Sequence, residues 1–207
     1  MLRIVNLEEI TDMLLRVPSL INLQENKDTN FIPEAKRWLL ELEKILERNK
    51  IPAAGAVASL RGVLISSERG AIPVSIEFQS RATGRKIREA TAAYVVRQAN
   101  DIVSNLIRKD QERISEAERI TRQLVSMAKA KGLIREHPYQ DNFAERLRVI
   151  WRMMSADQAL SQGTQSVEGL IGPNDALIIL DRSITQDIEH NLLRPNHPHI
   201  HDKVQET

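Results

Sequence analysis

The residues of this sequence that are best suited to chemistry lie near its end, where the histidines are concentrated. Four of the five histidines follow residue 189, at His190, His197, His199 and His201. The last three alternate with other residues, so an extended backbone would direct all three imidazole rings to one side. Neutral imidazoles bind zinc, nickel or copper. A metal site at His197, His199 and His201 is therefore one alternative, and a polar, histidine-rich tail without a metal ion is the preferred interpretation.

A second pairing in the same tail combines an arginine with a histidine. Arg194 and His199 have Arg-x4-His spacing, and this pair resembles the catalytic motif of HEPN-type ribonucleases, which are all-helical. The resemblance implies that the arginine stabilises phosphate charge and that the histidine performs metal-independent acid–base chemistry. It covers six residues, and Pro195 and Pro198 within them disfavour the helix that presents the motif in that family.

No other catalytic motif is present in the sequence. It contains no Gly-x-x-x-x-Gly-Lys-Ser/Thr loop for phosphates, no Gly-x-Gly-x-x-Gly, no His-Glu-x-x-His and no Gly-x-Ser-x-Gly. The absence of cysteine excludes disulfides, iron–sulfur clusters, thiolate metal sites and thiol nucleophiles. We therefore expect no catalytic residue, no metal and no cofactor, and the sequence favours a protein that is not an enzyme.

The charges of the chain are unevenly distributed, although its formal net charge is only +1. Residues 51–109 hold nine basic and four acidic side chains, whereas residues 155–207 hold three basic and eight acidic ones. Lysine and arginine contact the phosphate backbone of DNA or RNA, so the clustered basic residues are candidates for nucleic-acid binding. This predicted basic set is Arg61, Arg69, Arg81, Arg85, Lys86, Arg88 and Arg97.

Two other roles are open for the basic set. Its side chains can pair with the acidic last helix of the same chain, through Asp181, Asp187 and Glu189. They can also pair with the unlike half of a second subunit and so fix the register of an oligomer.

The composition favours a soluble, helical protein. Hydrophobic residues make up 42% of the chain and charged residues 28%, but aromatic residues only 3%. So few aromatic side chains disfavour β-sandwiches, β-barrels and a surface that stacks on single-stranded bases. No apolar stretch approaches eighteen residues, and the first residues do not resemble a signal peptide. We expect a cytoplasmic protein with no membrane partner.

Apolar periodicity predicts the helices that must position these residues. Helices are expected to start near Asn6, Pro33 and Pro52, the third being rich in small residues that permit close packing. A very long helix is predicted over about 84–131, because neither glycine nor proline interrupts it. Its expected core stripe in the first half is Ile87, Tyr94, Ile102 and Leu106.

Two further helices are predicted after the long one. The first, near 143–154, has Met153 and Met154 beside Trp151 in the expected core. The second starts at Asn174 or Asp175. The segment between them, Ser161 to Pro173, contains three glycines and is predicted to be a loop.

Residues 72–78 differ from the rest of the chain. Ile72, Val74, Ile76 and Phe78 alternate with other residues, which is typical of a strand. No second alternating run is evident, so this segment is expected to be an extended arm or an edge that recruits another chain.

These elements predict a mainly α fold. We expect a bundle of five or six helices, including the long helix at about 84–131, with a short extended segment near 72–78. Residues 1–193 are expected to form a single helical domain, from which the long helix can project, and residues 194–207 a polar tail.

Three functional hypotheses follow. The preferred one is a non-catalytic helical subunit or adaptor of a multi-protein assembly, which contacts a protein partner or a second copy of itself through helices and a strand edge. A helix of about 70 Å exceeds the length of a small bundle, which motivates this hypothesis. The second is nucleic-acid binding through the basic face at residues 61–97. The third is a HEPN-like ribonuclease with Arg194 and His199 as its catalytic pair.

Overall fold

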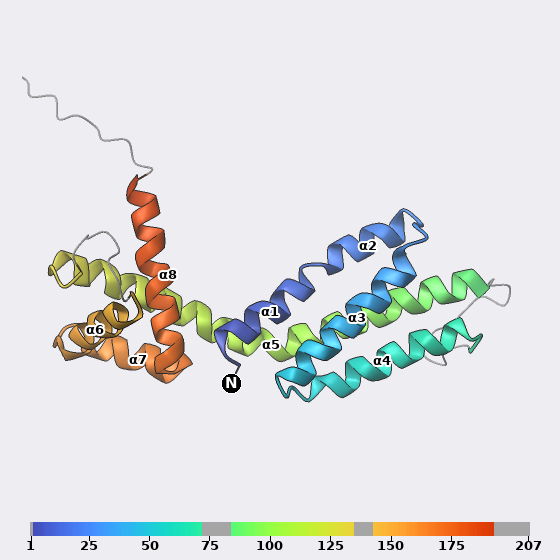
Figure 1. The fold of residues 1–207 in the computed structure, drawn as a ribbon, viewed down its shortest axis with the longest axis horizontal. Coiled ribbons are helices and arrows are strands. Elements are labelled where there is room, and N and C mark those ends of the chain that lie inside the picture. Colours follow the sequence, from blue (N-terminus) through green and yellow to red (C-terminus); the bar gives the residue numbers. More distant parts are fainter. Residues whose placement is uncertain (1, 72–83, 135–142, 193–207) are drawn as a thin grey trace, which may run out of the picture. The chain divides into compact units, whose positions relative to one another are not determined.

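The computed structural model describes residues 2–71, 84–134 and 143–192, and every regular element within them is an α-helix (Figure 1). The prediction of a mainly α protein with one long helix is confirmed. The predicted extended segment at 72–78 lies outside the described residues. The helices are α1 (Ile4–Leu14), α2 (Val17–Glu25), α3 (Phe31–Arg48), α4 (Ala53–Glu68), α5 (Gly84–Ala130), α6 (Phe143–Ala156), α7 (Ser161–Ile171) and α8 (Pro173–Leu192).

The described part of the chain holds more helices than the five or six predicted, for two reasons. Pro18 lies in the first turn of α2 and separates it from α1, because proline is tolerated where a helix begins. The segment predicted as a loop at Ser161–Pro173 instead forms α7, so that prediction was wrong.

The contacts between Cα atoms divide the chain into two compact units, Met1–Glu112 (unit 1) and Arg113–Thr207 (unit 2). Helices α1 to α4 belong to unit 1 and α6 to α8 to unit 2, while α5 contributes residues to both. The single domain expected for residues 1–193 stays a prediction, since two compact units in one chain can still fold together.

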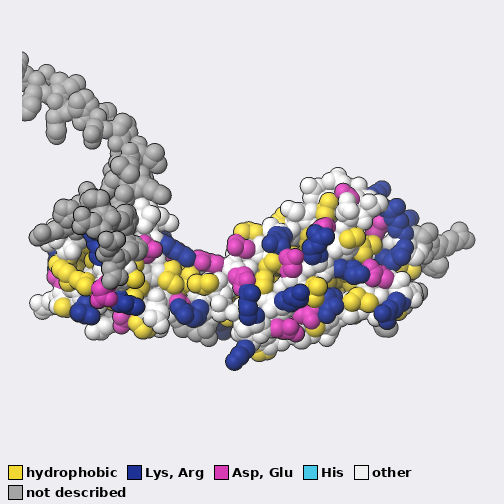
Figure 2. Space-filling model, viewed as in Figure 1, with side chains coloured by type: hydrophobic (Ala, Val, Ile, Leu, Met, Phe, Trp, Pro, Cys, Tyr) yellow, Lys and Arg dark blue, Asp and Glu magenta, His cyan; other side chains and the backbone are white. Residues whose placement is uncertain are grey.

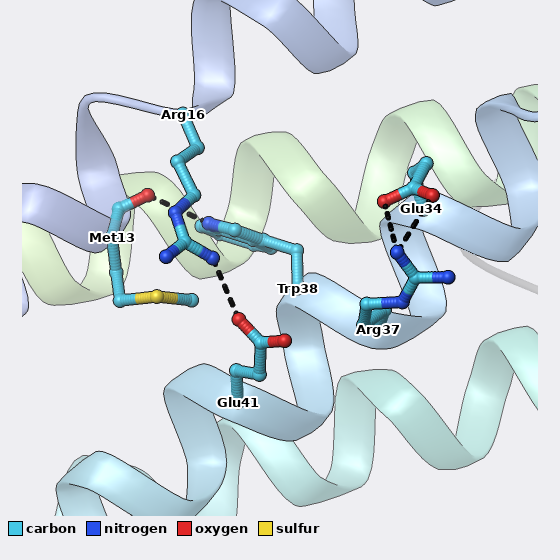
Figure 3. A network of polar contacts seen from close by, with 6 residues as sticks. All are labelled: Met13, Arg16, Glu34, Arg37, Trp38 and Glu41. Atoms are coloured by element: carbon cyan, nitrogen blue, oxygen red, sulfur yellow. Dashed lines mark hydrogen bonds and ion pairs between the residues drawn. The ribbon is translucent and has the colours of Figure 1, made fainter.

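Helix α3 organises unit 1, where α1, α2 and α4 all pack against it. The helical spacing of its apolar residues predicts a buried stripe at Ala35, Trp38, Leu39, Leu42, Ile45 and Leu46; all of these are buried except Ile45, which is half-buried. The indole N–H of Trp38 donates a hydrogen bond to the main-chain carbonyl of Met13 at 2.7 Å (Figure 3). This bond ties α3 to the last turns of α1 and satisfies a buried polar group.

The buried face of α5 in unit 1 differs from the predicted stripe. Ile87, Tyr94 and Ile102 are only half-buried and Leu106 is 41% exposed. Small and β-branched side chains occupy the core instead. The buried residues are Ala92, Ala93, Val95, Val96, Ala99, Val103 and Ile107, together with Thr91.

In unit 2, α6, α7 and α8 pack against one another. The inner face of α6 includes the buried residues Leu147, Ile150, Trp151 and Met154. The indole N–H of Trp151 donates to the carboxylate of Glu168 on α7 at 2.7 Å. Met153 was predicted in the core, but it is 42% exposed, because it lies about 100° around the helix from Met154, at the edge of the buried stripe of α6.

Gly163 explains why α7 resembled a loop in the sequence. A Cβ atom at this position would lie 2.7 Å from Cδ2 of Leu124 on α5, closer than van der Waals contact allows. The glycine therefore permits close packing of two helices, although glycine usually weakens a helix.

Two glycines of α7 give a matched pair for testing this role. A Cβ at Gly169 would meet nothing within 4 Å. Gly169→Ala is expected to raise the free energy of unfolding by about 0.5–1 kcal/mol, through helix propensity alone. Gly163→Ala has the same gain but must displace buried Leu124, and we expect it to be about 1–3 kcal/mol less stable than Gly169→Ala. Urea denaturation followed by circular dichroism measures both; equal stabilities would contradict the close approach.

Candidate functional site

The structure separates the predicted basic set into residues with different environments. Arg61, on α4, forms a two-point ion pair with Glu43 of α3, and this pair occupies its guanidinium group. Its Nε donates to Glu43 Oε2 at 2.6 Å and a terminal nitrogen donates to Oε1 at 3.2 Å. The hydrogen bond to Glu43 is the main reason that the pKa of Arg61 is raised above its ordinary value. Arg61 therefore joins two helices of unit 1.

Three members of the basic set lie together at one end of unit 1. Arg69 follows the last residue of α4, and Arg85 and Lys86 are in the first turn of α5. All three side chains are exposed. Arg85 donates from Nε to Glu89 at 2.7 Å, and a terminal nitrogen lies 3.5 Å from the carbonyl oxygen of Lys27.

Lys27, which sequence reasoning missed, completes this group. It is exposed and follows α2 in the turn that leads to α3. Figure 2 shows dark-blue lysine and arginine side chains gathered around this turn, at the right-hand end of the surface. We call Lys27, Arg69, Arg85 and Lys86 the basic end.

The backbone at Lys27 is unusual for a residue with a side chain. Its φ is +54°, in the left-handed region that favours glycine. The N–H of Lys27 bonds to the carbonyl of Gln24 and that of Asp28 to Leu23, which is the Schellman arrangement at a helix end. Lys50 has a φ of +55° and ends α3 with the same pattern, through Glu47 and through Ile51 bonded to Leu46.

The remaining members of the basic set lie elsewhere. Arg88 is half-buried on α5, and its Nε is buried with no hydrogen-bond partner among the described residues. Arg97 is exposed further along α5. Arg81 lies outside the described residues, as do the side chains of Asp187 and Glu189, so pairing of the basic set with the last helix stays a prediction.

A second surface that sequence reasoning missed is the outer face of α6. Val149 and Met153 are each 42% exposed and four residues apart, so they lie on one side of the helix. Arg148 and Arg152 have the same spacing and are also exposed. We call these four residues the α6 outer face. The sequence could have revealed this face, because helical periodicity places these four residues outside the buried stripe of α6.

Unit 1 also contains an open groove of about 340 Å³ between α1 and α3. Its charged lining includes Glu9, Asp12, Arg16, Glu41 and Lys44. Arg16 donates to Glu41 at 2.6 Å (Figure 3), and Glu9 is paired with Arg48. Because these pairs offset much of the charge in the groove, its lining does not favour a ligand of either sign.

The residues that suggested catalysis or metal binding are not described by the structure. Arg194, His197, His199 and His201 all lie beyond residue 192, where its description ends. Within residues 2–71, 84–134 and 143–192 no cluster of three histidine or acidic side chains is arranged to hold a metal ion. None of the helices in those ranges is both apolar enough and long enough to cross a bilayer.

No family model, curated protein or solved structure compared with this chain matches it.

Proposed function

We propose that this protein is a non-catalytic, cytoplasmic adaptor subunit of a multi-protein assembly, and that its α6 outer face binds an acidic amphipathic helix of a partner protein. The observation that carries the proposal is the exposed apolar pair Val149 and Met153, bordered by Arg148 and Arg152. The opposite side of α6 is buried in unit 2, so packing in the core of that unit holds the helix in place.

The α6 outer face has the composition of a docking surface. Apolar side chains at i and i+4 are the anchors by which one helix packs on another. Methionine adapts its shape to a partner more readily than branched side chains do. Such a pair gains free energy when a partner removes it from water.

The charges beside the apolar pair specify an acidic partner. Arg148 forms an ion pair with Glu145 at 3.3 Å, but these side chains are 60% and 54% exposed, so the pair is weak and exchangeable. Arg152 forms no ion pair with any residue that the structure describes. A partner helix with glutamate or aspartate beside its apolar stripe would complement both arginines.

The other charged side chains support a structural role over catalysis. Ion pairs connect different segments within each unit: Arg16–Glu41, Lys36–Glu68, Arg48–Glu9 and Arg61–Glu43 in unit 1, and Lys131–Asp157, which joins the residue after α5 to the residue after α6, in unit 2. In the last of these, the hydrogen bond from Lys131 holds the pKa of Asp157 below its ordinary value. These groups stabilise the two units and present no reactive constellation.

Site-specific photocrosslinking tests the proposal. A photoreactive phenylalanine analogue placed at position 153, in cells that naturally produce the protein, should yield one discrete adduct. The same analogue at Gln165, exposed on α7, should not. Arg152→Glu should abolish the adduct at 153, and the crosslinked partner segment should be an acidic amphipathic helix.

Two results would contradict the proposal. Equal crosslinking at 153 and 165, or none at either, would show that α6 is not a docking face. An adduct of twice the chain mass, matched by a dimer in light scattering, would identify a second copy of the chain as the occupant instead.

A further inference from the structure

We propose that the basic end of unit 1 binds the phosphate backbone of a nucleic-acid duplex without reading its base sequence. The four residues of the basic end come from three separate segments: the turn between α2 and α3, the end of α4 and the start of α5. This activity goes beyond the proposed adaptor function and uses a different unit of the chain.

Contacts within unit 1 bring the three segments to one end. The 3.5 Å contact between Arg85 and the carbonyl oxygen of Lys27 joins the start of α5 to the turn before α3. Lys36, in the second turn of α3, donates to Glu68 at 2.8 Å and so holds the end of α4 beside the start of α3. Figure 1 shows the end of α4 and the start of α5 at the same end of unit 1.

The charge at this end is positive after its acidic residues are included. Two of the acidic groups are already offset, because Lys36 pairs with Glu68 and Arg85 with Glu89. A third, Asp28, accepts a hydrogen bond from the main-chain N–H of Asn30 at 2.8 Å. Among the described residues, the basic ones at this end are Lys27, Lys36, Arg69, Arg85 and Lys86, and the acidic ones are Glu25, Asp28, Glu68 and Glu89.

The composition of this surface favours phosphates over a protein partner. A protein interface needs an apolar centre. The exposed large apolar residues of the described chain are Val5, Leu15, Leu40, Leu106, Met127, Val149 and Met153, and none belongs to the three segments. Phosphate contacts require only accessible cations, which Arg69 and Lys27 provide.

The aromatic residues favour a duplex over a single strand. Proteins that bind single strands stack bases on exposed aromatic rings. Among the described side chains, Phe31, Trp38 and Trp151 are buried and Tyr94 is half-buried. Binding through contacts with the phosphate backbone of the nucleic acid alone would therefore be independent of its base sequence and strongly dependent on salt concentration.

Lys27 occupies a position where glycine would be more stable. In the left-handed region a residue with a Cβ carries an energetic cost that glycine does not. Its positive charge near the end of α2 regains part of that cost. Lys50 has the same conformation and charge at the opposite end of α3, so it is a control for both effects.

The test measures binding of the full chain to fluorescein-labelled DNA duplexes of about 20 base pairs by anisotropy. One phosphate contact from each of the four residues of the basic end predicts that affinity falls roughly 150-fold between 50 and 200 mM NaCl. Two duplexes of unrelated sequence are expected to bind within twofold of each other.

Matched double variants locate the site. Lys27→Gly with Arg69→Gln removes two cations from the basic end, and we expect a loss of affinity of at least tenfold at 50 mM NaCl. The slope of log affinity against log salt concentration should also decrease, by the amount that corresponds to about two fewer phosphate contacts. Lys44→Gln with Lys50→Gly removes the same charge and relieves the same backbone strain at the other end of α3. This control is expected to bind within twofold of wild type, and thermal melts should show both variants folded.

Four results would overturn the proposal: no binding at 50 mM NaCl, equal loss in the two double variants, tighter binding of a single strand of equal length, or tighter binding of vesicles containing phosphatidylserine. The last would assign the basic end to lipid phosphates instead. None of these results bears on crosslinking at α6, so the two proposals fail independently.

Discussion

Replacing Trp38 with alanine is expected to lower the free energy of unfolding by about 4 kcal/mol. Trp38 is only 3% exposed, at the centre of the packing between α3 and the rest of unit 1. The substitution leaves a large cavity and also removes the hydrogen bond to the carbonyl of Met13. Urea denaturation followed by circular dichroism at 222 nm measures the loss.

Trp38→Phe separates the two contributions. Phenylalanine retains most of the packing but has no N–H donor, so the carbonyl of Met13 loses its indole partner. We expect a cost of about 1–2 kcal/mol for this variant. If Trp38→Ala cost less than about 2 kcal/mol, or no more than Trp38→Phe, the central role of this side chain in unit 1 would be wrong.

The ion pair between Arg61 and Glu43 supplies the second large effect. Glu43 is 8% exposed, so removing its partner leaves a carboxylate with little access to water. Fully buried pairs lose about 3–5 kcal/mol when broken from one side. Because the side chain of Arg61 is still 29% exposed, we expect Arg61→Met to cost less, about 2 kcal/mol.

A double variant distinguishes an unpaired charge from lost packing. Arg61→Met with Glu43→Leu removes both charges, and its stability is expected to lie within about 1 kcal/mol of wild type. Arg37→Met breaks an exposed pair with Glu34 (Figure 3) and should cost less than about 0.5 kcal/mol. A double variant as unstable as the sum of its single substitutions would show that the two side chains act independently, so that lost packing and not an unpaired carboxylate determines the loss.

The helices were predictable where local pattern and tertiary packing agree. In α3 the large apolar residues recur at helical spacing and all face one core, so periodicity identified Trp38 and Leu42 directly. In α5 the residues that enter the core are small, such as Ala92 and Ala99, and hydrophobic size selected the wrong face. Gly163 lowers local helix propensity, and only its distance to Leu124, 39 residues earlier, explains its presence.

The candidate site was predictable only in part, for the same reason. Clustering along the sequence found Arg69, Arg85 and Lys86, but it could not reveal that Arg61 on α4 forms an ion pair with Glu43 on α3. Lys27 was missed because Arg85, which contacts its main-chain carbonyl oxygen, is 58 residues away in the chain. The exposed side of α6 was overlooked because Met153 beside Met154 and Trp151 suggested a continuous core.

The chain has two tryptophans, and the structure places one in each unit: Trp38 in unit 1 and Trp151 in unit 2. Both indoles are buried and both donate their N–H to a defined acceptor. Each unit therefore carries its own intrinsic fluorophore, whose emission shifts to longer wavelength when water reaches the ring. Replacing either tryptophan with phenylalanine leaves a single optical reporter, through which ligand binding or unfolding in one unit can be followed without a label.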